Sequence, residues 1–425
     1  FKLVLASSSS VCANLYTVVR NCHRVAGKES VASPWARAIW SLGRTFNHEC
    51  GQRVKHVLLD IDDAQWMSKV LTRGFVHGQE TAFRGNQQVY VAQLQRVRGP
   101  KTLNEPVLDI GVVVTGGFGG LAGIYARLFA EKPGLKALVL MGRSGARAVT
   151  FDRASKVPTF CCSCDVSSQG EFLQSIWNST VVVGVNSWQV FHMAGVLADA
   201  LLRNLSWDDF VKVLRPKVAG LANLSKTITN RVLFSSIAST LGNIGQANYA
   251  AANGFLDGFA ASACRTVSIG WGAWEAGLYA ELPESLRNDA ATLKVSEAAI
   301  LLEECIETQK PLIVAARVDW DSLPRFPMWS HLMKKKEGHG RGKVAAFDGR
   351  IVDEAVRKVL GLGADDYVEE DAALRDLGFD SMMSVELRNL LQDRVALELP
   401  ATLLFDYPSV GKLKALLQER LQPGD

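Results

Sequence analysis

The sequence predicts an α/β fold with a small helical unit at its C-terminal end. A β-rich run over Val107–Thr115 leads into a glycine cluster, Gly116–Gly123, and then into an apolar helical segment, Ile124–Ala130. A strand, a glycine loop and a helix in this order are typical of α/β proteins. After a charged, glycine-rich stretch at 334–343, apolar residues from Ile351 onward recur at helical spacing, which predicts the helical unit.

Length and composition exclude several classes of protein. With 425 residues and 48% hydrophobic side chains, the chain can bury the cores of two or three compact domains. The net charge of +4 is small for this length and no basic block with interleaved aromatic residues occurs, so we expect no nucleic-acid partner. No apolar run reaches the ~18 residues that a membrane span needs, and we expect a cytoplasmic protein without a membrane span.

The cysteines favour buried free thiols over a metal site. The sequence has eight of them, and most stand alone. Cys161, Cys162 and Cys164 lie close together, but no second ligand pair stands at zinc spacing. We therefore expect no metal.

Residues 1–105 have the pattern of part of a βαβ unit. Trp35–Arg44 has apolar residues at helical spacing, with Gly43 near the expected end of the helix, and Val57–Asp62 has the composition of a strand. Phe1–Leu5 also has the composition of a strand, and no initiator methionine precedes it, so we expect a fragment of a longer protein. We expect this part to brace the rest of the chain rather than to carry a site.

The glycine cluster has the composition of a phosphate-binding turn. A β-carbon in such a turn would keep the backbone away from a pyrophosphate, whose charge the N–H groups of the following helix can bind. The last position of the glycine pattern is Ala122, a variant that the pattern tolerates. The residues expected to hold the cofactor are Gly116, Gly117, Gly119, Gly120 and Leu121.

The next strand indicates which dinucleotide is bound. It spans Ala137–Met141 and is followed by Gly142, Arg143 and Ser144. An enzyme that uses NAD usually has a carboxylate here, which holds the ribose 2′-hydroxyl. An arginine and a serine suit a 2′-phosphate instead, so we expect NADPH. Without the glycine cluster before it, Arg143 would be interpreted as a solvated arginine at a strand end.

A further stretch carries side chains suited to chemistry on a carbonyl group. Val232–Phe234 is a short strand-like run, so Ser235 and Ser236 fall at a strand end, whereas Tyr249 and Asn253 stand four residues apart on one face of an apolar helix. A serine lies thirteen residues before the tyrosine in FSSIAS…GQANYAAANGFLDG. This wording resembles the ketoreductase domain of modular polyketide synthases and fatty acid synthases, which is of the short-chain dehydrogenase/reductase type.

The resemblance implies the chemistry of this stretch. Ser236 and Tyr249 would hydrogen-bond a ketone, NADPH would deliver hydride to its carbon, and Tyr249 would supply the proton to its oxygen. Many short-chain reductases have a lysine where this chain has Asn253; the resemblance assigns that role to Lys217, within Arg215–Gly220, which would lower the pKa of the phenol. Asn253 would hold a water in the proton relay. A lysine on an ordinary surface helix is the alternative interpretation.

The resemblance also assigns residues along the cofactor. Asp165 and Val166 would contact the adenine, although a surface carboxylate is the alternative for Asp165. Ala194 and Gly195 would pass under the nicotinamide ribose. Trp271 begins a Trp-Gly-x-Trp loop that would pack beside the nicotinamide, and the residues after it, 275–295, would form a mobile lid.

Three residues would orient the substrate: Asp199, Leu241 and Trp271. Asp199 ends the triplet Leu197–Asp199, which resembles the Leu-x-Asp of ketoreductases that give a D-configured hydroxyl. Leu241 stands where ketoreductases that give the L hydroxyl have a tryptophan. The resemblance therefore implies the D-configured product, with Asp199 guiding the substrate arm.

The C-terminal part, 346–425, resembles an acyl carrier protein. Ile351–Leu360 predicts an amphipathic helix, and a Gly-Phe-Asp-Ser motif that ends at Ser381 precedes a second helical segment, 384–392. The resemblance implies a covalent 4′-phosphopantetheine on Ser381, at a helix N-terminus that favours a phosphodiester. A plain helix cap is the alternative interpretation of the motif.

These patterns and resemblances imply a doubly wound parallel sheet of the Rossmann type, between a truncated Rossmann-like subdomain and a four-helix carrier domain. The expected division is a structural subdomain at 1–105, a catalytic domain at 106–330, a flexible linker at 331–345 and a carrier at 346–425. The implied reaction is NADPH-dependent reduction of a carrier-bound β-ketoacyl thioester to the β-hydroxyacyl thioester. The implied partners are ketosynthase and acyltransferase domains of a parent synthase and a phosphopantetheinyl transferase.

Two other functions stay open. Three connections are shorter than is usual for such a ketoreductase, at 146–159, Asn223–Arg231 and Ser262–Thr266. They would suit an inactive scaffold beside a working carrier. The reductase could also act on a free metabolite, although the attached carrier argues against it.

Overall fold

The computed structural model describes most of the chain. Four expected features lie wholly or mostly outside the described residues: the strand at Phe1–Leu5, the cofactor residue Ser144, the lid at 275–295 and the linker at 331–345. The described residues are 13–23, 25, 32–50, 54–67, 75–85, 88–97, 99, 110–143, 157–172, 174–175, 185, 187–225, 228, 230–276, 291–320, 323–333, 348–360, 362–363, 366–374, 377, 379, 381–395, 397, 399 and 403–421.

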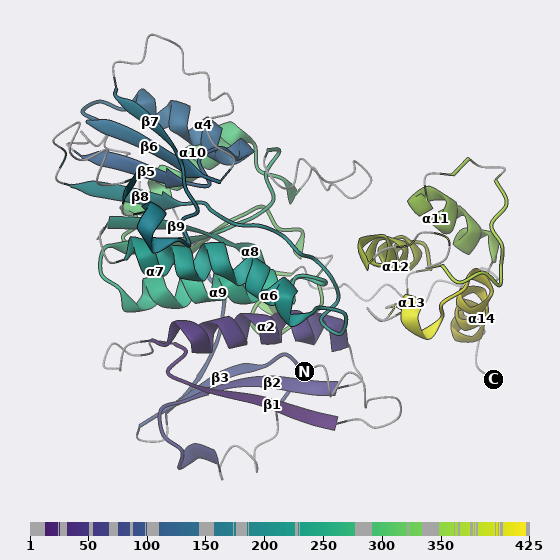
Figure 1. The fold of residues 1–425 in the computed structure, drawn as a ribbon. Helices are drawn as coiled ribbons and strands as arrows, with labels where there is room; N and C mark the ends of the chain where they lie inside the picture. The colour runs from purple at the N-terminus through teal and green to yellow at the C-terminus, as the bar shows by residue number, and fades with distance from the viewer. Residues whose placement is uncertain are drawn as a thin grey trace.

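In the part of the chain that is described, seven strands form one parallel sheet (Figure 1). From one edge to the other they are β11 (Leu312–Ala315), β10 (Thr266–Trp271), β9 (Asn230–Ser236), β8 (Trp188–His192), β5 (Gly111–Thr115), β6 (Ala137–Gly142) and β7 (Thr159–Ser163). The order reverses beside β5, because the chain adds β6 and β7 on one side and β8 to β11 on the other. The predicted doubly wound sheet is therefore confirmed, and the loops after β5 and β8 meet at the point of reversal.

Helices cover both faces of this sheet (Figure 1). Side chains alternate between the faces of a strand, so Val112 and Val114 pack in the core under α4 and α10, whereas Val113 packs in the core that includes Leu224 of α7. The catalytic helix α9 lies on the same face as α7. The four helices are α4 (Gly120–Ala130), α10 (Val295–Glu307), α7 (Gly220–Leu224) and α9 (Ala247–Ser262).

The N-terminal residues form a second, smaller sheet. Its strands β1, β2 and β3 are parallel, and β4 is antiparallel to β3. They are β1 (Ala13–Arg20), β2 (Val54–Ile61), β3 (Glu80–Arg84) and β4 (Gln88–Val91). The expected βαβ unit is present as β1, helix α2 and β2.

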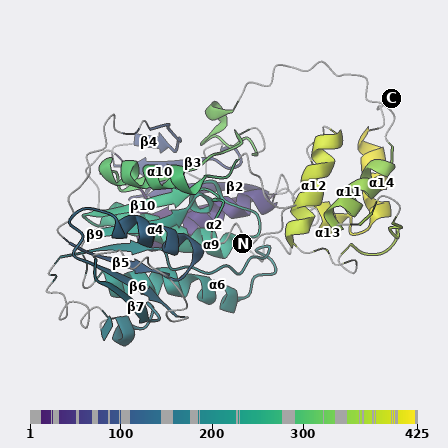
Figure 2. The ribbon, with the colours of Figure 1, turned by 90° about the horizontal axis from the view of Figure 1, so that it is seen from above.

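Helix α2 (Pro34–Cys50) is longer than the sequence pattern predicted. The expectation that it ends near Gly43 is wrong, because that glycine serves close packing: a β-carbon there would lie 2.6 Å from Leu58 Cδ2 on β2. Figures 1 and 2 show α2 between the small sheet and α9, so neither side of its second half faces water. Its buried polar residues are Ser41, Arg44, Thr45, Asn47, His48 and Glu49.

A buried ion pair ties α2 to the small sheet. Arg44 Nε donates to Glu80 Oε1 at 2.7 Å, and Trp40 Nε1 donates to Glu80 Oε2 at 2.9 Å. Burial raises the pKa of Glu80, but the charge of Arg44 and the hydrogen bonds from Arg44 and Trp40 together outweigh it, so the pKa is lowered and the pair stays ionised at neutral pH. Such a pair adds little net stability, yet removal of one partner would leave a costly unpaired charge.

Two glycines let α2 and α9 approach closely. A β-carbon on Gly258 of α9 would lie 2.6 Å from Pro34 Cα and 2.8 Å from Arg37 Cβ on α2. One turn earlier, a β-carbon on Gly254 would lie 2.8 Å from the carbonyl oxygen of Arg37. Because backbone atoms cannot move aside as flexible side chains can, this packing requires glycine at both positions.

The C-terminal residues form a helical unit with its own core. Helix α11 buries Val352, Ala355, Val356 and Val359, which recur at helical spacing as predicted. Helix α12 starts at Ser381 and is longer than the predicted 384–392 segment. The helices are α11 (Arg350–Leu360), α12 (Ser381–Val395), α13 (Leu403–Asp406) and α14 (Val410–Leu421).

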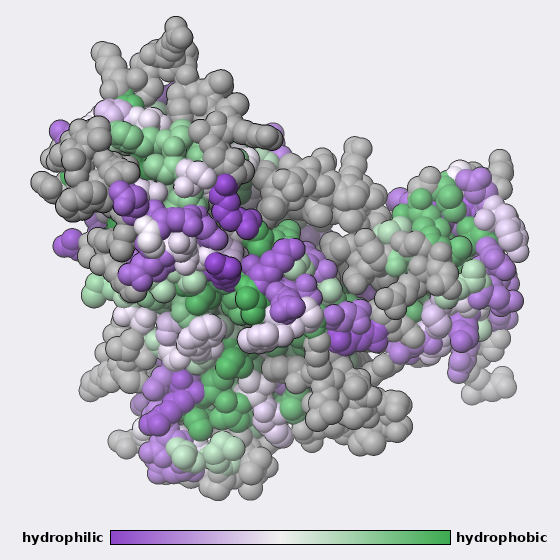
Figure 3. Space-filling model, in the orientation of Figure 1, coloured by the Kyte–Doolittle hydropathy of each residue, from purple (hydrophilic) through white to green (hydrophobic). Residues whose placement is uncertain are grey.

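Figure 3 shows one face of the molecule, on which hydrophobic residues gather in patches between hydrophilic ones. Among the described residues, no helix has both the length and the apolar character that crossing a bilayer requires. In the same ranges, no three His, Cys, Asp or Glu side chains gather as metal ligands would.

We expect Gly258→Ala to lower the free energy of unfolding by about 1–3 kcal/mol, because the added methyl group collides with the backbone of α2. Gly123→Ala on α4 is the matched control: a β-carbon there meets nothing within 4 Å, so alanine should stabilise the helix by up to about 1 kcal/mol. Urea denaturation of both variants measures the difference. Equal stability of the two variants would contradict the close approach of α2 and α9.

Candidate active site

The expected catalytic residues meet where β9 ends. Ser236 is the last residue of β9, and its Oγ accepts a hydrogen bond from Ala238 N (3.2 Å) at the start of helix α8 (Ile237–Leu241). Tyr249 and Asn253 lie on the first two turns of α9. The strand end and helix predicted from the sequence are thus both present, and they face each other across the same end of the sheet.

Lys217 lies in the interior rather than on a surface helix. It belongs to a π-helical turn (Arg215–Ala219) between α6 (Trp207–Leu214) and α7. Its side chain is 2% exposed, and its Nζ donates to Phe234 O on β9 at 3.0 Å and lies 5.7 Å from the centre of the Tyr249 ring. The π turn, a feature that often marks functional sites, was not predicted from the sequence.

Burial dominates the titration of both residues. Desolvation lowers the pKa of Lys217 to about 8, although the charge of Asp257 opposes this. Desolvation also raises the pKa of Tyr249, and the charge of Asp199 adds to this, while hydrogen bonds with Asn253 and Ser236 lower it. The expected depression of the phenol pKa by Lys217 is therefore not seen in this structure. Tyr249 stays protonated at neutral pH, which is the state of a proton donor.

The side chain of Asn253 has an open acceptor atom. Its Nδ2 donates to Tyr249 O, one turn earlier, at 2.9 Å. Its Oδ1 is buried without a hydrogen-bond partner. A buried polar atom in that state costs about 1–3 kcal/mol, so the position suits a bound water or a substrate hydroxyl.

The glycine loop has the shape that a pyrophosphate requires. Gly116 has a φ of +70°, and a β-carbon there would lie 3.0 Å from Ala194 N. Gly119 and Gly120 are exposed, and a β-carbon on Gly119 would meet only Gly116 O, at 3.3 Å. Because α4 begins at Gly120 rather than at Ile124 as expected, its first unpaired N–H groups belong to the loop itself. The residues present therefore fit a dinucleotide.

Other expected members of the loop support it. Gly117 N donates to Met141 O at 2.8 Å, which joins the loop to the end of β6. Leu121 is partly buried against the main core, so its side chain anchors the first turn of α4.

The turn after β8 links the two halves of the site. Ala194 N donates to Thr115 Oγ1 at 3.3 Å, next to the glycine loop. A β-carbon on Gly195 would lie 3.1 Å from Lys217 Cε. This turn therefore brings the glycine loop and Lys217 to one place, and the expected contact of Ala194 and Gly195 with the nicotinamide ribose stays a prediction.

The expected adenine and 2′-phosphate residues lie at the ends of β6 and β7. Arg143 is exposed just after β6. Burial raises the pKa of Asp165, but hydrogen bonds from Ser167 N (2.9 Å) and Ser167 Oγ (2.6 Å), and the charge of Arg143, outweigh this and lower it. Val166 is buried in the core, so its side chain serves packing. An adenine contact by Val166 would have to come from its backbone.

Asp199 lies beside the start of α9. Its Oδ2 accepts a hydrogen bond from Gln246 Nε2 at 2.7 Å. Burial raises the pKa of Asp199, and the bond from Gln246 offsets only part of this. The carboxyl group is therefore near Tyr249, whose pKa its charge raises.

Leu241 and Trp271 are both core residues. Leu241 is buried with Phe326 and Trp329. Trp271 is buried on β10, pairs in register with Ser236, and has an Nε1 without a hydrogen-bond partner. Their predicted roles in orienting the substrate stay predictions.

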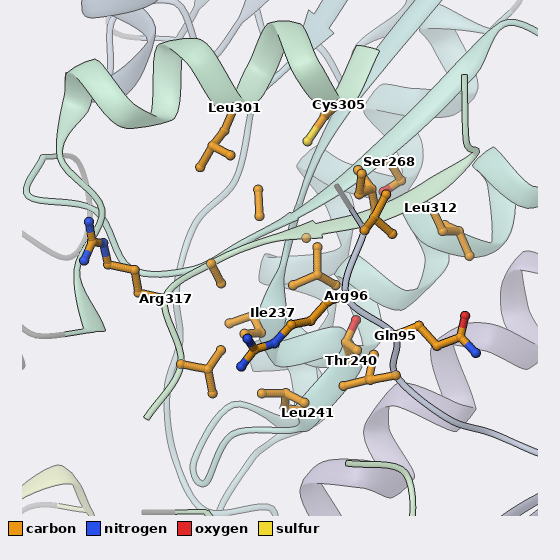
Figure 4. Close-up of a pocket in the computed structure, with 18 of the residues that line it drawn as sticks. Gln95, Arg96, Ile237, Thr240, Leu241, Ser268, Leu301, Cys305, Leu312 and Arg317 are labelled. Atoms are coloured by element: carbon orange, nitrogen blue, oxygen red, sulfur yellow. The ribbon is translucent and has the colours of Figure 1, made fainter. Parts of the chain in front are cut away.

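A groove of about 760 Å³ lies elsewhere, along the edge strand β11 (Figure 4). One side of the groove is lined by residues of α8, which are Ile237, Thr240 and Leu241. Two arginines from other segments, Arg96 and Arg317, also line it. Of the four expected catalytic residues, none lines this groove. The expected catalytic residues therefore lie at the end of β9, where the polar groups converge, and not in this groove.

Two acidic residues near the site were missed. Asp257, two turns after Tyr249, accepts hydrogen bonds from Ser239 Oγ (2.6 Å) and Ser268 Oγ (2.7 Å). Glu49 on α2 contacts loops next to Tyr249. Each carboxylate interrupts a buried helix, and this could have drawn attention to them in the sequence.

Ser381 is the first residue of α12, so the expectation that it starts a helix is confirmed. Its side chain and the preceding Asp380 are outside the described part of the chain.

Comparisons with known proteins agree with this geometry. Residues 111–276 match the family model of the KR domain, and residues 350–417 match that of the phosphopantetheine attachment site. The spectinabilin polyketide synthase system protein NorA′ of Streptomyces orinoci is 30% identical over 91% of the chain, and erythronolide synthase EryA3 of Saccharopolyspora erythraea is 31% identical over 97%. The chain spans only 12% and 14% of the lengths of these relatives.

Solved structures show the same fold. The ketoreductase PlmKR1 from the first module of phoslactomycin biosynthesis in Streptomyces sp. HK803 superimposes with a TM-score of 0.67 at 25% identity, covering 78% of this chain and 85% of that one. An A1-type ketoreductase gives a TM-score of 0.62 at 26% identity, covering 72% and 69%. The chain therefore contains a KR domain and a phosphopantetheine attachment domain, and its relatives are modular polyketide synthases.

Proposed function

We propose that the chain reduces a carrier-bound β-ketoacyl thioester to the β-hydroxyacyl thioester with NADPH, as one step of polyketide chain assembly. The observation that carries the proposal is the meeting of buried Lys217 with Tyr249 at the end of β9, next to Gly195. The similarity to ketoreductases over the same residues supports it.

The chain's own residues would bind the ketone and move one proton. NADPH, when bound, supplies the hydride. Ser236 and Tyr249 hydrogen-bond the ketone oxygen, and Tyr249 donates its phenolic proton as negative charge develops there. Lys217 is an ammonium below its pKa of about 8 and stabilises the phenolate that remains. The open Oδ1 of Asn253 holds the water that returns a proton to Tyr249.

The cofactor would be held by the glycine loop and the ends of the strands. The N–H groups at the start of α4 bind the pyrophosphate, and Gly119 and Gly120 leave room for it. Arg143, with Ser144, binds the 2′-phosphate of NADPH. Asp165 and Val166 border the adenine, and the turn at Ala194 borders the nicotinamide ribose.

The carrier part would hold the substrate. Phosphopantetheine on Ser381 carries the acyl chain as a thioester, and a phosphopantetheinyl transferase attaches the arm. Ketosynthase and acyltransferase domains of a parent synthase would build the chain, which agrees with the much greater length of the relatives. The cytoplasmic location, the domain boundaries and the D-configured product stay predictions.

We expect Tyr249→Phe to lower the rate of reduction at least about 100-fold, because the proton donor is lost. Its dissociation constant for NADPH should stay within about twofold, since the glycine loop is unchanged. The assay follows NADPH oxidation with a β-ketoacyl thioester of N-acetylcysteamine. Tyr90→Phe, which removes an exposed phenol, is the matched control.

The same assay with the unmodified chain distinguishes the proposed function from the two alternatives, an inactive scaffold and a reductase of free metabolites. NADPH binding without turnover would mean an inactive scaffold. Faster turnover of free ketones than of thioesters would mean a reductase of free metabolites.

Arg143→Ala should lower the ratio of kcat/KM for NADPH to that for NADH by about 10- to 100-fold. This is the factor expected from the loss of one hydrogen bond to a charged group. The measurement is the ratio of kcat/KM for the two cofactors. Arg127→Ala removes another exposed arginine, on α4, and should leave the ratio unchanged. A wild-type chain that uses both cofactors equally would contradict the assignment.

A phosphopantetheinyl transferase with coenzyme A should add one phosphopantetheine arm to the chain, and Ser381→Ala should abolish the mass increase. Ser384→Ala, one turn along α12, should still be loaded. Free thioesters should be reduced at the wild-type rate by Ser381→Ala, because the carrier does not form the active site. A mass increase that survives in Ser381→Ala would refute the attachment site.

A further inference from the structure

Helix α2 reaches across from the small sheet to two loops that border the catalytic helix. Glu49, near its end, is 4% exposed. Its Oε2 accepts a hydrogen bond from Leu202 N at 2.8 Å, and its Oε1 accepts one from Gly245 N at 3.0 Å. One carboxyl group thus holds a loop three residues after Asp199 and a loop four residues before Tyr249.

The same two loops are also bonded to each other. Neither contains a helix or strand at these positions, so their arrangement depends on such individual hydrogen bonds. Three bonds join them: Ala200 N to Gly245 O (2.8 Å), Gln246 Nε2 to Asp199 Oδ2 (2.7 Å) and Asn248 Nδ2 to Ala198 O (2.7 Å). The Glu49 carboxyl group therefore accepts a hydrogen bond from each of the two loops that meet at this junction.

Other residues of α2 hold the chain that leads from Ser236 to this junction. Arg44 Nη1 donates to Ser239 O at 2.7 Å, and His48 Nε2 donates to Leu241 O at 2.7 Å. In Figure 1, α2 runs beneath α8, α9 and α6. Its polar side therefore faces backbone groups of the active-site loops and not only the small sheet.

Two backbone donors that point at one side chain require two acceptor atoms. An ionised carboxylate supplies both, whereas a protonated carboxyl group or an amide supplies one good acceptor and one donor. Burial raises the pKa of Glu49 to about 7, against the hydrogen bonds from Leu202 and Gly245 and the charge of Arg203, which lower it. The neighbouring His48 is neutral near pH 7, since burial lowers its pKa to about 4.

We propose that Glu49 is a positioning residue, which fixes Asp199 relative to the start of α9 and so sets the position of the Asp199 carboxyl group beside Tyr249. The N-terminal part of the chain, which contains the small sheet and α2, would then influence substrate binding and stereochemical selection in addition to supporting the fold. This inference rests on the function proposed above, because it names a residue that acts on the same site through other residues.

Stability and selectivity should respond to pH in opposite directions. The pKa of Glu49 in the folded chain lies above its ordinary value of 4.5, so protonation favours folding. This contribution to stability is present in full below pH 4.5 and is lost as the pH rises through about 7. Protonation also removes one of the two acceptors, so the loops should loosen as the pH falls below about 7. If Glu49 served stability alone, the selectivity would not fall at low pH while the stability contribution of Glu49 rises.

The test compares Glu49→Gln with the unmodified chain at one pH unit above and one below the pKa of Glu49. At the higher pH, the variant should have a KM for the β-ketoacyl thioester raised about 2- to 10-fold, the worth of one hydrogen bond, with a smaller change in kcat. The ratio of the two hydroxyl configurations should fall. The unmodified chain should approach these values at the lower pH, so the difference between the variant and the unmodified chain should shrink there. The titration of Lys217 and Asp199 is common to both chains, so this difference reports on Glu49.

Amide hydrogen exchange gives a readout that does not depend on activity. Peptides that contain Leu202 and Gly245 should exchange about 2- to 10-fold faster in Glu49→Gln. The control is Ile39→Ala, which changes a side chain of α2 that is 45% exposed and should behave as the unmodified chain.

Unchanged KM, configuration ratio and exchange in Glu49→Gln would overturn the inference while leaving the proposed function intact. If the unmodified chain reduces no thioester, the proposed function fails instead, and exchange still tests the hold of Glu49 on the loops. Should Glu49→Gln fail to fold, the pH series of the unmodified chain decides. The inference would be overturned if KM and the configuration ratio stayed constant across pH 7 and if the Leu202 and Gly245 amides kept the same protection after correction for the intrinsic pH dependence of exchange.

Discussion

The close contact between α2 and α9 is the constraint on which the site depends. Gly254 and Gly258 allow the two helix backbones to touch, and α9 carries Tyr249 and Asn253 on its first turns. A helix that is fixed along one side by backbone contact cannot shift without opening the core. The catalytic phenol is therefore placed by a helix from outside the main sheet.

Burial at this contact also explains the unusual polar composition of α2. A helix enclosed on both sides must satisfy most of the polar groups that it carries. Arg44 does so with Glu80 and a carbonyl group after β9, and Glu49 does so with two loop amides. The same hydrogen bonds that make burial tolerable also hold the active-site loops, so stability and positioning share their residues.

Lys217 and Tyr249, the two titrating groups at the centre of the site, show how burial in a low-dielectric interior favours the neutral form of each group. Burial moves the pKa of Lys217 down to about 8 and that of Tyr249 up, which keeps the phenol protonated beside a lysine that is only partly charged at moderately alkaline pH. The Oδ1 atom of Asn253, on the same helix as Tyr249, is buried without a hydrogen-bond partner. In the proposed reaction, the neutral phenol would be the proton donor.

The sequence by itself determined the doubly wound sheet, the glycine loop and the residues at the end of β9, because strand and helix periodicity and local motifs depend on neighbouring residues. It also identified Ser236, Tyr249 and Lys217 as candidate catalytic residues. For Lys217, the identification rested on the resemblance to ketoreductases. Only the tertiary structure decided where α2 ends, that Lys217 is buried in a π turn, and that Glu49 holds the loops. These depend on contacts between residues far apart in the chain, such as Glu49 with Gly245, for which local pattern carries no signal.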